Sequence, residues 1–90
     1  MTLPPADGRV ETVQHDLYSY QIARQTLEQS QGKVFLRVNR VNGPDMDYSE
    51  GQIAKDVAEA YCGRYNRQIN PVAYGMFSAP GAWVFEGGCT

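Results

Sequence analysis

Length, composition and charge limit what this chain can be. Its 90 residues leave room for one domain, and 8 basic against 10 acidic side chains give a formal net charge of −2. This balance provides no general electrostatic attraction to nucleic acid or to an anionic membrane. The chain is 42% hydrophobic, which excludes the disordered class. We expect residues 1–8 to form a flexible lead-in and residues 9–90 a single small domain.

The segment 9–27 carries two competing periodicities. Tyr18, Tyr20 and Ile22 alternate with small or polar residues, which favours a strand. A helical spacing is also present, at Leu17, Tyr20, Ala23 and Leu27. We prefer the strand because the next segment needs a pairing partner.

The segment 33–41 reads as a strand with one buried face. Val34, Leu36 and Val38 share one side of it, and β-branched and aromatic residues dominate its composition. Glycine at position 32 and the Asn-Gly-Pro run at 42–44 bound it on either side.

The clearest helix runs from about Ser49 to about Tyr65. Ser49 followed by Gln52 matches a capping box at its start. One side of the helical wheel is apolar and comprises Ile53, Ala54, Val57, Ala58, Tyr61 and Tyr65. Cys62 lies at the margin of this apolar face, and the Asn-Pro pair at 70–71 prevents the helix from continuing.

The remainder predicts a hairpin. Residues 72–77 alternate, residues 78–81 offer Pro and Gly in the order of a type II turn, and residues 82–86 follow with Trp83 and Phe85 on one face. The predicted order is ββαββ. The simplest solution is an α+β fold, with about four antiparallel strands and one helix packed on one face of the sheet.

The two cysteines, Cys62 and Cys89, predict one disulfide. Period-two alternation puts Cys89 on the side of Trp83 and Phe85, which should face the helix that carries Cys62. A thin-cored domain with an even cysteine count favours such a bridge and therefore an oxidising compartment. Two unrelated reduced thiols are the alternative. The first eight residues lack the basic and apolar regions of an export signal, so the chain is either cytoplasmic or has lost that signal.

Tests for metal, cofactor and catalytic motifs lead us to assign none of these sites. Residues 45–56 fail the EF-hand pattern, because Glu50 stands where glycine is required and Asp56 where a bidentate glutamate is required. His15 is the only histidine, in an early polar stretch, and no phosphate-binding or dinucleotide-binding motif occurs. No apolar run approaches the ~20 residues that span a bilayer.

Basic and aromatic residues do not form a nucleic-acid signature. Arg37 and Arg40 differ in strand parity and should point to opposite faces, while Arg64 and Arg67 lie near the helix C-terminus, where cations are structurally favoured. Most aromatic side chains are expected in the core. Those that the pattern leaves free to be exposed are Tyr18, Tyr20, Tyr48 and Phe77.

Two segments, 54–62 and 83–89, resemble small exported bacterial proteins and lipoproteins of uncharacterised function. Those proteins carry an alanine-rich helix with one cysteine and a last strand with another, as this chain does with Cys62 and Cys89. The resemblance implies a periplasmic or surface location and assigns no catalytic residue.

Three functional hypotheses follow. The first is a noncatalytic exported module of the bacterial envelope that binds a protein, an envelope component or a small ligand, but not nucleic acid. It would be periplasmic or extracellular after removal of an export signal. The second is a small enzyme, or enzyme subunit, that uses Cys62 or His15. The third is a cytoplasmic accessory protein with reduced cysteines.

Overall fold

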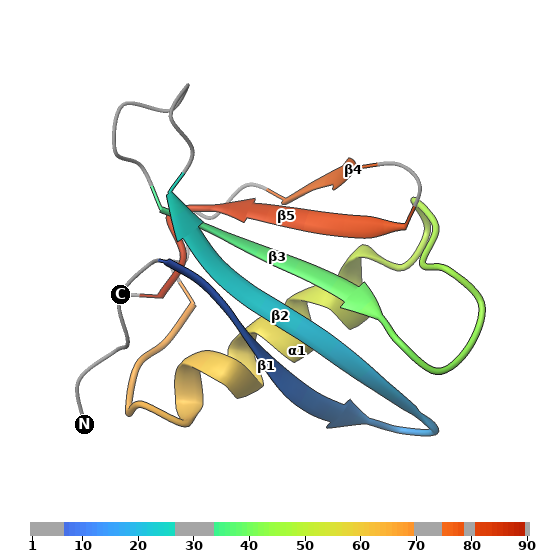
Figure 1. Ribbon diagram of the computed structural model, residues 1–90, viewed down its shortest axis with the longest axis horizontal. Helices are drawn as coiled ribbons and strands as arrows, with labels where there is room; N and C mark the ends of the chain where they lie inside the picture. The colour runs from blue at the N-terminus through green and yellow to red at the C-terminus, as the bar shows by residue number, and fades with distance from the viewer. Residues whose placement is uncertain (1–6, 27–33, 70–74, 79–80, 90) are drawn as a thin grey trace.

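The chain folds into one α+β domain in which a helix covers one face of an antiparallel sheet. A computed structural model describes residues 7–26, 34–69, 75–78 and 81–89. The elements in chain order are β1 (Asp7–His15), β2 (Tyr18–Thr26), β3 (Val34–Arg40), α1 (Gly51–Gly63), β4 (Gly75–Ser78) and β5 (Ala82–Glu86). The sheet order is β1-β2-β3-β5-β4, and α1 crosses behind it in Figure 1. The predicted fold class is confirmed.

The segment that was ambiguous in sequence forms two strands. β1 and β2 pair as a hairpin around Asp16 and Leu17, with Val13 opposite Tyr20. Asp16 adopts a left-handed conformation (φ 53°), which aspartate tolerates better than most residues. The sheet therefore has five strands and the order is βββαββ, where about four strands in the order ββαββ were predicted. β1 also begins at Asp7, inside the predicted lead-in.

The core lies between α1 and the sheet. Ile22, Leu36 and Val38 supply its centre from β2 and β3 and are fully buried. The helix contributes the apolar face that its sequence predicts, with Ala54, Val57, Ala58 and Tyr61 buried and Ile53 and Tyr65 partly buried. Each large aliphatic side chain buried in this way contributes about 1.5–3 kcal/mol.

The start of α1 differs from the predicted capping box. The N-cap residue is Glu50, without a side-chain capping bond. Ser49 instead donates from both its backbone N–H and its hydroxyl to the Asp47 carboxylate, which turns its side chain toward Asp47, outside the helix. The indole N–H of Trp83 donates to the Asp47 carbonyl at 3.0 Å. The loop before the helix is thus held against β5.

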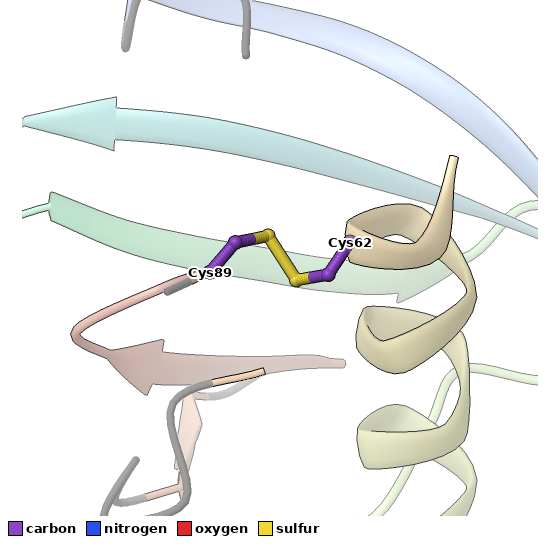
Figure 2. The surroundings of a disulfide bond; sticks show 2 residues. All are labelled: Cys62 and Cys89. Atoms are coloured by element: carbon purple, nitrogen blue, oxygen red, sulfur yellow. A yellow bond between two sulfur atoms is a disulfide. The ribbon is translucent and has the colours of Figure 1, made fainter. Parts of the chain in front are cut away.

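A disulfide ties the end of α1 to the segment that follows β5. Cys62 and Cys89 are bonded, with their Cα atoms 5.5 Å apart and a sequence separation of 27 (Figure 2). This is the pairing that the strand parity predicts. Cys62 is fully buried rather than at the margin of the helix face. An isolated bridge between Ile69 and Cys89 adds a second link in the same region.

Candidate functional site

Cys62, which the sequence analysis considered as the nucleophile of an enzyme, forms a disulfide with Cys89. The sulfur of Cys62 is bonded to that of Cys89, and the residue is fully buried. A thiolate, not a disulfide sulfur, is the catalytic nucleophile of cysteine enzymes. In this bonded state Cys62 has no nucleophile to offer.

His15 ends β1 beside two carboxylates. Its Nδ1 lies 3.4 Å from Asp16 Oδ2, and its Nε2 lies 3.5 Å from Asp56 Oδ2 on the helix. Its ring meets Tyr20 edge-on. Tyr20 is the one hydroxyl-bearing residue among the contacts of His15 in the described residues, and its hydroxyl accepts hydrogen bonds from Arg40 instead. These contacts join the β1–β2 turn to α1.

A buried arginine organises the same end of the sheet. The Arg40 side chain is 6% exposed and pairs with Glu50, whose hydrogen bond raises the pKa of Arg40. Arg40 Nη2 also donates to the Tyr20 hydroxyl at 3.0 Å, and Nη1 donates to the Pro44 carbonyl at 2.9 Å. Its guanidinium lies 4.5 Å from the centre of the Tyr18 ring. Tyr20 is consequently buried, contrary to the exposure that its pattern allowed.

A second polar cluster fixes the other end of α1. Arg64 donates from Nη1 to Glu11 Oε1 at 3.0 Å and from Nη2 to the Thr12 carbonyl at 2.6 Å, so it grips the outer strand β1. The Tyr65 hydroxyl donates to Glu11, which raises the pKa of Tyr65. Both clusters join the helix to the sheet, and their hydrogen-bonding groups bind partners within the fold.

The opposite face of the sheet is not covered by α1 and faces the viewer in Figure 1. Strand parity and register place there the side chains of Val10, Thr12 and Gln14, of Ser19, Gln21, Ala23 and Gln25, of Phe35, Arg37 and Asn39, of Met76 and Ser78, and of Ala82, Val84 and Glu86. We call this the open face. Uncharged polar side chains alternate on it with apolar ones, of which Phe35 and Ala82 are buried.

A polar hollow of about 260 Å³ lies at one corner of the open face. Its described lining consists of Arg37, Asn39, Arg40, Asp45, Gly81 and Ala82. Two of its lining residues, Asn39 and the small Ala82, pair across β3 and β5. Gly81 packs so closely on the loop after β3 that an added Cβ would lie 2.7 Å from Asp45 Cβ.

Two side chains of the hollow carry opposite charges and form no ion pair with any residue of the described structure. Arg37 is half-buried, and Asp45 is exposed. Neither makes an ion pair or a side-chain hydrogen bond with any residue in the described ranges, including each other. Arg40, by contrast, is fully engaged by Glu50 and its other partners. Among its described lining residues, the hollow therefore presents one available cation, Arg37, and one available anion, Asp45.

A larger hollow, of about 450 Å³, lies beside α1. Its described lining is Lys55, Glu59, Arg67, Gln68 and Ile69. Every charged side chain among them belongs to an exposed residue. Unlike the polar hollow with its half-buried Arg37, this hollow has no partly buried charged residue among its described lining, so we assign it no ligand.

Sequence reasoning placed Arg37 on the face opposite to Arg40, and the register confirms this. The sequence gives no sign that Asp45 and Gly81 lie near Arg37, because these residues meet only through the β3–β5 pairing.

Within the described residues, no group of three or more His, Cys, Asp or Glu could hold a metal ion. Nor is any described helix long and apolar enough to cross a membrane.

The chain was compared with protein-family models, with curated proteins and with solved structures, and it matches none of them. The function proposed below therefore rests on the chemistry of the hollow and on the disulfide.

Proposed function

We propose that this protein is a noncatalytic binding module of the bacterial envelope and that the polar hollow is its binding site. The observation that carries this proposal is Arg37, a half-buried guanidinium without a hydrogen-bond or ion-pair partner among the described residues. A guanidinium offers a rigid fork of donors that suits planar acceptors. Polar groups that converge on a concave site without partners of their own are the usual anchors of ligand recognition.

The disulfide supports a location in an oxidising compartment. Such bonds persist in secreted and periplasmic proteins and are rare in the reducing cytoplasm. The Cys62–Cys89 bridge closes a loop between helix and sheet in a domain with a thin core, where a staple contributes most. The resemblance to small exported bacterial proteins points the same way. We place the mature protein in the periplasm or at the cell surface, after removal of an export signal.

The side chains that could serve in catalysis are already bonded within the fold, which supports a binding role over the catalytic alternative. Cys62 is bonded, His15 lies between Asp16 and Asp56, and the buried Arg40 is paired. Each of these groups holds two elements together.

An NMR screen tests the proposal. Isotope-labelled protein is mixed in turn with small sugars, carboxylates, phosphates, amines and amino acids, and the backbone amides of Asn39, Gly81 and Ala82 are followed. At least one compound should shift these signals, and Arg37→Met should abolish the shift. Gln14→Ala is the matched control, since it removes a polar side chain from the same face two strands away. A screen in which no compound moves the hollow signals would contradict the proposal.

A further inference from the structure

We propose that the ligand of the hollow is a small zwitterion, a free α-amino acid, whose carboxylate is bound by Arg37 and whose ammonium group is bound by Asp45. This inference rests on the proposed function and names the chemistry of the same site. It follows from the charges, the donors and the size of the hollow.

The charges select against ligands of a single sign. Arg37 and Asp45 line one hollow without pairing with each other. An anion such as phosphate would be attracted by Arg37 and repelled by Asp45, and a simple cation would meet the opposite balance. A neutral ligand would leave both charges without a counter-charge. A zwitterion supplies a partner of the correct sign to each side chain.

The donors and acceptors of the hollow match the two ends of an amino acid. The guanidinium of Arg37 can hold a carboxylate through two parallel N–H···O bonds. Asn39 lies two residues further along β3 on the same face, so its amide adds both a donor and an acceptor beside Arg37. The Asp45 carboxylate can accept hydrogen bonds from an ammonium group.

The size of the hollow favours a single small molecule. Its volume of about 260 Å³ is below the ~300–1,000 Å³ of sites for drug-sized ligands. Gly81 and Ala82 keep it open because they add no side chain larger than a methyl group. No aromatic residue is among the described lining, so a sugar ring would have no ring to stack on.

A matched ligand series separates this inference from the proposed function. Labelled protein is titrated with glycine, with N-acetylglycine, which lacks the ammonium group, and with glycinamide, which lacks the carboxylate. Glucose and inorganic phosphate complete the series. Glycine should shift the amides of Asn39, Gly81 and Ala82 and the Nε–H of Arg37. Each blocked analogue should bind at least about tenfold more weakly.

Variants assign the two ends. Arg37→Met should abolish binding of glycine, whereas Asp45→Asn should remove the preference for glycine over N-acetylglycine. Gln14→Ala should change neither affinity. The amide spectrum of each variant shows directly whether it retains the native fold.

Three results would overturn the inference: N-acetylglycine that binds as tightly as glycine, an unchanged preference in Asp45→Asn, or glucose or phosphate shifting the hollow when glycine does not. The last result would leave the hollow as a binding site for another ligand. If no compound shifts the hollow, both the inference and the proposed function fail.

Discussion

Replacing Glu50 by glutamine should destabilise the protein strongly, because it leaves the charge of Arg40 without its counter-charge. The Arg40 side chain is 6% exposed and that of Glu50 is 19% exposed, so water replaces the lost carboxylate poorly. Removing one partner of a fully buried ion pair costs about 3–5 kcal/mol. Two features reduce this cost. Glu50 is partly exposed, and Arg40 keeps its bonds to Tyr20 and Pro44. We expect a loss of about 2–3 kcal/mol, at or below the low end of that range.

The double variant Arg40→Met/Glu50→Gln separates a buried charge from lost packing. It removes both charges and keeps an apolar side chain of similar length over Tyr18. Because a buried pair replaced as a whole is often close to neutral, the double variant should be more stable than Glu50→Gln alone.

The free energy of unfolding is measured by urea denaturation, followed by the fluorescence of Trp83. This is the only tryptophan of the chain, and its indole donates to the loop that precedes Glu50. Glu59→Gln, on the exposed side of α1, is the control for losing a carboxylate from the same helix. The reasoning is refuted if Glu50→Gln stays within about 0.5 kcal/mol of the parent, the range of an ordinary surface change.

Three further predictions concern the core, the disulfide and the pH dependence of stability. Val57→Asp should cost several kcal/mol because Val57 is fully buried. Glu59→Lys should stay within about 0.5 kcal/mol, and equal denaturation midpoints would show that the helix orientation is wrong. Reduction of the disulfide between Cys62 and Cys89, separated by 27 residues, should lower stability by about 3.5 kcal/mol; a urea midpoint that reductant does not move would contradict this. Burial raises the pKa of Tyr61, so its stabilising contribution should be complete below pH about 10 and be lost as pH rises through the higher folded value. Ultraviolet absorbance should show two tyrosines, Tyr61 and Tyr65, ionising late, and ordinary titration of all tyrosines would contradict that expectation.

The helix and its orientation could be predicted because one physical rule dominates there. Val57 and Tyr61 follow the 3.6-residue period of an amphipathic helix, and burial decides which side faces the sheet. The β1–β2 hairpin was missed because its turn, Asp16–Leu17, contains neither glycine nor proline. The capping box failed because the Asp47 carboxylate competes for the Ser49 hydroxyl, a choice that residue types alone do not decide.

The candidate site was predictable only in part. Strand parity assigns Arg37 to the face opposite the helix without any knowledge of tertiary structure. The position of Asp45 beside Gly81 depends on a loop and a turn that meet through the pairing of β3 with β5. Local sequence patterns carry no signal for such a meeting.

The central claim is that this protein is a disulfide-bonded binding module of an oxidising compartment. The thiol state of the protein in its native cells tests this claim most directly. The full natural gene is expressed in its own host, and the cells are treated with an alkylating reagent before any reduction. We predict that Cys62 and Cys89 remain unmodified until reductant is added, and that mass spectrometry finds their peptides joined. Immediate alkylation of both cysteines would contradict the account and would favour the cytoplasmic accessory protein.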